Sequence, residues 1–260
     1  GKHLDCPTLR LTNQHGLMIA GEAALSNWDA GMDMYIYGKL GNLTMTKEGI
    51  NVLMTNLTGK VPPILQRLDY IRFNGEAAGY LHDLTLTGLF HTGAGMVKTD
   101  VMMSIDEQSM SRTYSGSVAS ADLDLGKLLN QEKKFGKVDF NVELKGFNYK
   151  NRYPESYIKG IISSFEYSQY QYENIMLDGV YKDGGFNGRL SMDDANGSVQ
   201  IDGNFNVAKT IPDFNLKASV KNLRPHDLHL SDKYENASIS LGLTADFTGK
   251  SIDDMNGRIS

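Results

Sequence analysis

Strict alternation of apolar and polar residues marks several short stretches between residues 172 and 207. Because successive side chains of a β-strand point to opposite faces, each stretch predicts a strand with one apolar face and one polar face. The dipeptides Asp183-Gly184 and Asn196-Gly197 lie between these stretches, and both tolerate the positive φ angles that tight hairpin turns require. The sequence therefore predicts a β-meander with one apolar face.

A short pattern, apolar-x-Gly-x-apolar, recurs along the chain with the glycine at the same parity as the apolar residues. It occurs at residues 36–40, 57–61, 86–90, 114–118, 158–162, 177–181, 186–190 and 201–205. A glycine on the apolar face of a strand leaves a gap or allows a sharp bend. Strands that repeatedly bend toward their apolar face curl a sheet into a trough, whereas flat strands stack as a sandwich.

Helical signals are few in this sequence. Residues 61–68 place two prolines at the start of one or two helical turns, and residues 125–134 place two lysines at the end of another. Neither stretch is long enough to cross between parallel strands. The sequence therefore predicts an all-β fold, a curved antiparallel meander forming an apolar trough, with one or two very short helices.

The polar run at residues 130–136 is the best candidate boundary. It divides the chain into a first repetitive β segment, residues 1–130, and a second one, residues 131–260, that continues the first. Three stretches, which begin at Met32, Ser115 and Phe214, each run from an alternating strand into a short Leu-rich element. Their similarity is loose, and it indicates internal repetition.

Composition excludes several classes of function. The net charge of −5 argues against a nucleic-acid partner, since phosphates require clustered cations and Lys133-Lys134 is the one dense basic pair. Apolar runs long enough to span a bilayer are absent from the sequence, and the single cysteine, Cys6, allows no internal disulfide. The chain starts without a signal peptide and ends within an alternating pattern, which suggests a piece of a longer protein.

The sequence signals for catalytic and metal-binding groups are weak. His226 and His229 would face opposite sides of a strand, so they could share a metal only on a helical turn. Asp193-Asp194 superficially resembles a calcium loop, but the glutamate at the twelfth position is missing and hairpin turns use the same residue types. A G-x-S-x-G nucleophile elbow is also missing. The sequence predicts no enzyme, no catalytic residue, no metal site and no cofactor.

Four aromatic residues lie close together in the stretch Phe165, Tyr167, Tyr170 and Tyr172. They could form a stacking platform for sugars, which would make the chain a carbohydrate-binding β-sandwich. Such a platform needs a bulge or turn near Ser168, because the first two rings otherwise face away from the last two. Cross-strand aromatic packing is the favoured interpretation.

Four longer stretches, in this order, carry a family resemblance: "YSGSVASADLDLGKLL", "FGKVDFNVELKGF", "IKGIISSFEYSQYQYENIMLDGVYKDGGFNGRLSMDD" and "PDFNLKASVKNLRPHDLHLSD". They resemble the TamB proteins (translocation and assembly module), of the Bacteroidetes type, within the AsmA-like superfamily. The likeness covers most of the chain and is strongest over residues 114–232. It implies a periplasmic, repetitive β-structure whose strands form a U-shaped, taco-like trough with an apolar interior.

In that family the full-length protein is anchored in the inner membrane by an N-terminal helix. The resemblance implies that the trough carries phospholipids from the inner to the outer membrane. The alternative it implies is a periplasmic scaffold for outer-membrane protein assembly, which pairs β-strands with a TamA/Omp85-type partner. Neither the anchor helix nor the family's C-terminal domain is recognisable in this sequence, so we expect an internal segment of such a protein.

Acyl chains need no polar partner, because burying apolar surface is worth about 25 cal/mol per Å². Residues that alternate along the strands are expected to line the trough: Phe140, Val142, Ile175, Leu177, Phe186, Leu190, Met192, Ile201, Phe205, Phe214, Leu216, Val220, Leu241 and Leu243. Their neighbours are expected to point away from it: Asn141, Glu143, Met176, Asp178, Arg189, Asp202, Asn204 and Lys217. The pattern leaves open whether the apolar face is an open trough or the core of a closed sandwich.

Overall fold

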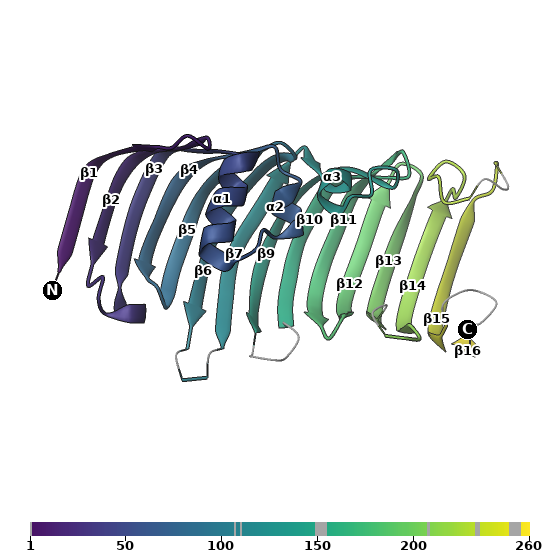
Figure 1. Ribbon diagram of the computed structural model, residues 1–260. Coiled ribbons are helices and arrows are strands. Elements are labelled where there is room, and N and C mark those ends of the chain that lie inside the picture. Colours follow the sequence, from purple (N-terminus) through teal and green to yellow (C-terminus); the bar gives the residue numbers. More distant parts are fainter. Residues whose placement is uncertain are drawn as a thin grey trace.

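The computed structural model describes residues 2–106, 108–109, 111–148, 155–206, 209–231, 235–249 and 256–260. These residues form one sheet of sixteen strands, in which strands that follow one another in the sequence lie side by side (Figure 1). The strands are β1 (His3–Thr12), β2 (Leu17–Ser26), β3 (Tyr35–Thr46), β4 (Tyr70–Tyr80), β5 (Asp83–Thr92), β6 (Gly95–Ile105), β7 (Arg112–Ala121), β8 (Leu123–Asp124), β9 (Phe135–Asn148), β10 (Glu155–Tyr167), β11 (Tyr170–Lys182), β12 (Gly185–Asp194), β13 (Gly197–Asn206), β14 (Asp213–Leu223), β15 (Ile239–Thr248) and β16 (Asn256–Ile259).

The predicted all-β class is confirmed. The paired strands are antiparallel throughout the described sheet, and the sheet is curved and open rather than closed into a barrel. The short strand β8 pairs with β9 next to the end of β7, so the chain passes from the first half of the sequence to the second within the same sheet. The division of the chain at residue 130 stays a prediction.

Helices in the described residues are α1 (Lys47–Thr58), α2 (Pro63–Gln66) and α3 (Leu125–Leu129), together with the 3-10 turn η1 (Gly31–Asp33). Two of them, α2 and α3, lie within the stretches where short helical turns were predicted. The third, α1, is 12 residues long and was not predicted. The predicted set of one or two very short helices is therefore incomplete.

The sequence signal for α1 was misinterpreted as a bent strand at residues 57–61. Gly59 instead ends the helix in the left-handed conformation, with a φ of 73°. The start of the helix is fixed by Thr46, whose Oγ1 accepts a hydrogen bond from the Gly49 N–H at 3.3 Å. The residues on either side of Gly59 fit a glycine that bends a strand as well as one that ends a helix. The helical spacing of Ile50, Leu53 and Met54 before it is the signal that identifies the helix.

Tight turns connect β11, β12 and β13, which lie in the alternating stretch where hairpin turns were predicted. Asp183 and Gly184, with φ of 51° and 77°, form a two-residue turn between the partners Lys182 and Gly185, as predicted. The next turn is formed by Ala195 and Asn196, one residue earlier than predicted, because Gly197 is the first residue of β13.

Five glycines on the apolar face belong to one cross-strand row. Its members, from β3 to β14, are direct partners on neighbouring strands: Gly38, Ala77, Leu86, Val101, Gly116, Leu144, Ile158, Gly179, Gly188, Gly203 and Leu216. We call it the glycine row. Gly116 and Gly203 have φ of 142° and 148°, and a Cβ on either would collide with the backbone of the adjacent strand. Glycine is therefore required at these two positions, because the backbone of the adjacent strand lies too close for a side chain.

Buried apolar residues gather where helices cover the sheet. The core cluster consists of Ile50, Leu68, Ile71, Ala94, Leu123, Leu128 and Val138. Residues of α1 and α3 meet residues of β4, β8 and β9 in this cluster, and Leu65 of α2 packs against it. In Figure 1, α1 and α2 lie in front of the sheet, near the edge where α3 also lies. This core cluster thus lies in the helix-covered part of the sheet.

Candidate functional site: the apolar face of the sheet

Cross-strand register brings the fourteen predicted lining residues onto one face of β9–β15. Three further rows of direct partners run parallel to the glycine row, and we name them for reference. The upper row is Phe140, Ile162, Ile175, Met192, Val199, Val220 and Leu241. The middle row is Val142, Gly160, Leu177, Leu190, Ile201, Ala218 and Leu243. The aromatic row is Gly146, Ser156, Tyr181, Phe186, Phe205, Phe214 and Phe247. Leu216 belongs to the glycine row, and the other thirteen lie in these three.

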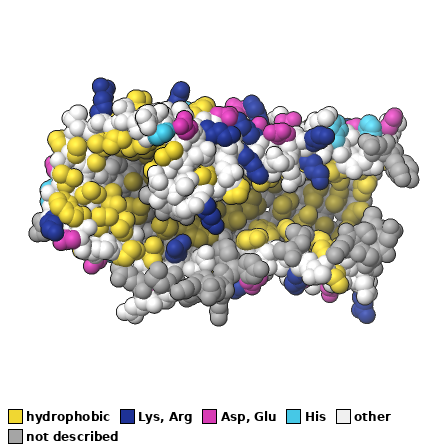
Figure 2. Space-filling view, viewed as in Figure 1, with side chains coloured by type: hydrophobic (Ala, Val, Ile, Leu, Met, Phe, Trp, Pro, Cys, Tyr) yellow, Lys and Arg dark blue, Asp and Glu magenta, His cyan; other side chains and the backbone are white. Residues whose placement is uncertain are grey.

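Exposure distinguishes an open face from a closed core. Thirteen of the fourteen residues are half-buried and Leu241 is 42% exposed, so none of them is buried as a sandwich core would be. Phe140 packs against the helix-covered core cluster. The eight residues expected on the other face, including Met176 at 54%, are all exposed. Figure 2 shows apolar side chains along this hollowed face on both sides of the helices. We call this face the trough.

The aromatic row forms one side of the trough. The rings of Phe186 and Phe205 lie 5.6 Å apart, and those of Phe214 and Phe247 stack at 4.7 Å. Phe205 and Phe214 are direct partners between these two pairs. Phe247 was not among the predicted lining residues, although its alternation with Leu243 carried the same signal. Side-chain packing between neighbouring strands makes this side continuous.

Residues missed in the sequence complete the upper row and extend the trough toward β2. Ile162 and Val199 complete the upper row between predicted residues. In the first half of the chain, the row that contains the partners Ile19, Leu43 and Phe73 continues the same face across β2, β3 and β4. The alternation there is interrupted by register shifts within β3, and these breaks hid the pattern.

One rim of the trough carries three Leu-rich elements. They are α1 after β3, α3 after β8, and residues 224–231 after β14. The last two include the Leu-rich ends predicted for the stretches from Ser115 and Phe214, whereas the Leu-rich end of the stretch from Met32 belongs to β3 and α1 follows it. Each of the three elements inserts a buried apolar side chain, namely Ile50 (1% exposed), Leu128 and Leu228 (0%). In Figure 1 all three elements lie along the same edge of the sheet. The trough is therefore covered from one rim only at these positions.

The four aromatic residues near Ser168 pack across strands, which was the favoured interpretation. Ser168 and Gln169 form a turn, so Phe165 and Tyr172 become direct partners on one face, with ring centroids 6.4 Å apart. The Tyr172 ring is 8% exposed, and its hydroxyl donates to the Leu228 carbonyl at 2.7 Å. Burial and a hydrogen bond to Asp194 raise the pKa of Tyr170 to about 12. These contacts leave no free ring platform at this position.

Candidate catalytic and metal-binding groups lie apart or make turn contacts. The His229 Nδ1 lies 2.8 Å from the Ser168 carbonyl, and the His226 Nδ1 lies 3.7 Å from an Asp227 carboxylate oxygen. Asp194 accepts from the Asn196 N–H at 2.9 Å, as expected of a hairpin turn. The described part of the chain brings no three His, Cys, Asp or Glu side chains together around a shared metal position. Among the described residues, every helix is too short or too polar to span a membrane.

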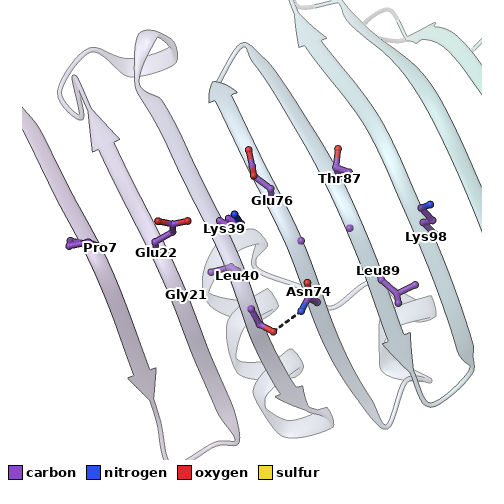
Figure 3. A pocket seen from close by; sticks show the side chains of 13 residues that line it. Pro7, Gly21, Glu22, Lys39, Leu40, Asn74, Glu76, Thr87, Leu89 and Lys98 are labelled. Carbon is purple, nitrogen blue, oxygen red and sulfur yellow. Dashed lines mark hydrogen bonds between the residues drawn. The ribbon is translucent and has the colours of Figure 1, made fainter.

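A separate hollow lies on the other face of the sheet (Figure 3). It has a volume of about 760 Å³ and is lined by side chains of β1–β6. Glu22, Lys39 and Glu76 are direct partners within it, and Asn74 donates to the Gly41 carbonyl at 2.8 Å. This hollow is open and its charges alternate in sign, so an acyl chain placed there would displace water from charged groups. The apolar face is therefore the better candidate for a functional site.

Together these features define an open, curved antiparallel sheet with one apolar face that helices cover only in part. A comparison with protein-family models, with curated proteins and with solved structures finds no match to the chain. What the chain does is therefore inferred from the trough.

Proposed function

We propose that this chain is a segment of a lipid conduit, in which acyl chains of phospholipids or fatty acids lie on the trough. The observation that carries the proposal is the face of β11–β15 away from the rim elements, where the upper, middle and aromatic rows are apolar and are half-buried except for the exposed Leu241 and Tyr181. Contiguous exposed apolar surface of this kind is unfavourable in water and marks binding surfaces in folded proteins.

The chemistry of the trough suits an acyl chain. Its lining supplies apolar contacts and no charge, and burying acyl surface there is worth about 25 cal/mol per Å². Each row runs across successive strands, so an acyl chain finds similar apolar contacts at neighbouring strands. A lipid can then move along the rows without leaving a single deep site, which suits transport better than storage.

The length of the sheet fits passage along its axis. Neighbouring strands lie about 4.8 Å apart, so sixteen strands make a trough on the order of 70 Å long. The resemblance to the TamB family supports a periplasmic place for this trough and a role in moving phospholipids from inner to outer membrane. In this proposal the chain is an internal segment, and an inner-membrane anchor belongs to the full-length protein.

A second candidate function is supported by the open edge of the sheet. β1 pairs with β2 alone among the described strands, so a further strand, of a client protein or of the rest of the full-length protein, could bind the backbone groups of its other edge. A scaffold that receives nascent outer-membrane strands, together with a TamA/Omp85-type partner, would use this edge. The lipid conduit uses the trough face instead, and the two functions therefore predict contacts at different residues.

Purified protein tests the conduit directly. Native mass spectrometry and lipid extraction of protein from a bacterial host should find phospholipid or fatty acid bound. A photocrosslinking side chain placed at Leu190 should capture lipid in cells, and the same group at the adjacent Arg189, on the other face, should not. Protein that carries no lipid and binds no fluorescent fatty acid would overturn the proposal. Capture of unfolded outer-membrane strands at His3 of β1, without lipid at Leu190, would favour the scaffold.

A further inference from the structure

The connection between β3 and β4 is longer than strand pairing requires. Thr46 and Tyr70 are direct partners at the end of this hairpin, so residues 47–69 form an insertion at its tip. The hairpin of β11 and β12 closes with two residues between the partners Lys182 and Gly185. Hairpin connections are usually two to five residues long. The insertion therefore needs an explanation other than joining two strands.

The insertion folds back over the trough as α1 and α2 (Figure 1). Ile50, Met54 and Leu65 of these helices pack in the core cluster with Phe90 and Val97, which lie on the trough face of β5 and β6. The helices thus place apolar side chains on the face where the conduit would place acyl chains. An acyl chain that moves along the side of the trough where the upper row lies would contact these apolar side chains.

Polar contacts of the insertion lie at the rim. The Lys127 Nζ of α3 donates to an Asp69 carboxylate oxygen at 2.6 Å and to the Gly93 carbonyl at 3.0 Å, and an Arg67 guanidinium nitrogen donates to the Leu128 carbonyl. The Lys127 ammonium also lowers the pKa of Asp69. We call these contacts the latch. Over the trough the contacts of the core cluster are apolar, which a bound acyl chain can replace without leaving a polar group unpaired.

We propose that α1 and α2 form a removable lid, which is held at the rim by the latch and lifts from the trough when an acyl chain passes. The inference rests on the proposed lipid conduit and concerns its regulation. Segments that open separately from the rest of a fold are those with few polar contacts to it. The latch lies at the rim, as does the contact at 2.8 Å between Glu48 of α1 and the ring of His15 in the turn between β1 and β2. Lid and acyl chain compete for the same apolar side chains, so lipid binding shifts the lid toward its open state.

Two variants change the lid in opposite directions. In the first, Asn-Gly replaces residues 47–69 between Thr46 and Tyr70, which restores a two-residue hairpin turn. In the second, Arg67→Cys and Lys127→Cys, in a Cys6→Ser background, are joined by a short reducible crosslinker across the latch. A crosslink between Lys159→Cys and Asp178→Cys, partners on the outer face, is the matched control because it holds two strands and leaves the lid free.

Stopped-flow uptake of a fluorescent C16 fatty acid is the first measurement. We expect uptake about tenfold faster after excision and about tenfold slower with the latch crosslinked, with recovery on reduction and no change in the control. Unchanged uptake by a folded excision variant overturns the lid, and so does unchanged uptake by the latched protein. If excision prevents folding, the latched protein alone decides the question.

Hydrogen exchange separates the lid from the conduit. Amides of α1 should exchange at least about tenfold faster than those of β9 and β10 in the wild-type protein, because the lid opens while the sheet stays paired. Exchange of α1 at the rate of these strands would mean that the helices open only when the sheet unfolds, and it overturns the lid. If neither the wild-type protein nor any of the variants binds the fatty acid, the proposed function fails. The exchange measurement still decides whether a lid exists.

Discussion

Arg189 and Asp202 face each other across β12 and β13, and two guanidinium nitrogens of Arg189 donate to one carboxylate oxygen of Asp202, Nε at 3.3 Å and Nη2 at 3.1 Å. The next residues along these strands, Leu190 and Ile201, are direct partners on the trough face. A slip of one residue would move both apolar side chains to the outer face. The ion pair therefore favours the register that builds the trough.

This pair belongs to a longer row of alternating charge on the outer face. Its members are direct partners on successive strands from β9 to β14: Glu143, Lys159, Asp178, Arg189, Asp202 and Lys217. Each of the four inner charges has neighbours of opposite sign on both sides within the row, and a slip of one strand past another would break such pairs. Opposite charges across strands are favourable and like charges are unfavourable.

We predict that Arg189→Glu lowers the free energy of unfolding by about 1 kcal/mol, because it places a carboxylate between Asp178 and Asp202. Adding Asp202→Lys to this variant should restore part of the loss, since an opposite-charge pair forms again. Urea denaturation of the two variants at low salt measures both effects. Equal stability of wild-type protein and Arg189→Glu would show that the charged row does not contribute to pairing.

Charge inside the trough has a different predicted outcome. Leu190→Arg and Ile201→Arg should keep the fold, with a loss of stability of about 1–2 kcal/mol, because a half-buried position on an open face lets the guanidinium reach water. A closed core would lose more, since an uncompensated buried charge costs about 3 kcal/mol or more. Fatty-acid binding by the purified variants should fall, as should lipid transport by the full-length protein in cells.

The control for these variants is Asp202→Arg, which adds the same side chain on the outer face next to Ile201. It should leave fatty-acid binding unchanged. Folded Leu190→Arg and Ile201→Arg proteins that bind fatty acid as the wild-type protein does would contradict a role of the trough in lipid binding. Extensive unfolding of both would contradict the open face.

Much of this fold was predictable from the sequence, and the reasons are local. Alternation at Leu177, Leu190 and Ile201 identified strands and the face they share, because the two-residue period of a strand is visible without knowledge of its partners. Turn residues such as Asp183-Gly184 located the hairpins. The helix α1 was missed because Gly59 fits a bent strand as well as a helix end, and its helical contacts form with distant strands.

The state of the apolar face was not predictable in the same way. A strand in an open trough and a strand in a sandwich have the same alternation, so the exposure of Leu241 or Met192 depends on whether a second layer is present. That layer is set by tertiary structure, and in the described residues it consists of short helices over part of the sheet. Ile162 and Phe247 were omitted because the lining residues were chosen strand by strand, without the cross-strand rows.

Alkaline pH should weaken the contact between the turn of β10 and β11 and the turn of β12 and β13. The pKa of Tyr170 is raised to about 12, by burial and by its hydrogen bond to Asp194, so the folded state holds this proton more tightly than the unfolded state, where the pKa is about 10. The contribution is present in full below pH 10 and is lost as the pH rises from 10 to 12. Urea midpoints should fall less steeply over pH 9.5–11.5 in Tyr170→Phe than in wild-type protein. Parallel curves would refute the linkage.

The glycine row gives the sharpest test of how the sheet acquires its curvature. Gly203, with a φ of 148°, has the backbone of Asn215 and Leu216 where a Cβ would lie, so Gly203→Ala should lower the free energy of unfolding by about 2 kcal/mol or more. Gly38 lies in the same row, but open space surrounds the position of its Cβ, so Gly38→Ala should be neutral or stabilising by about 0.5 kcal/mol. Thermal and urea melts of the two alanine variants provide the comparison. If both lose equal stability, glycine is needed for a reason other than the close approach of strands, because the two sites share the row and differ in that contact.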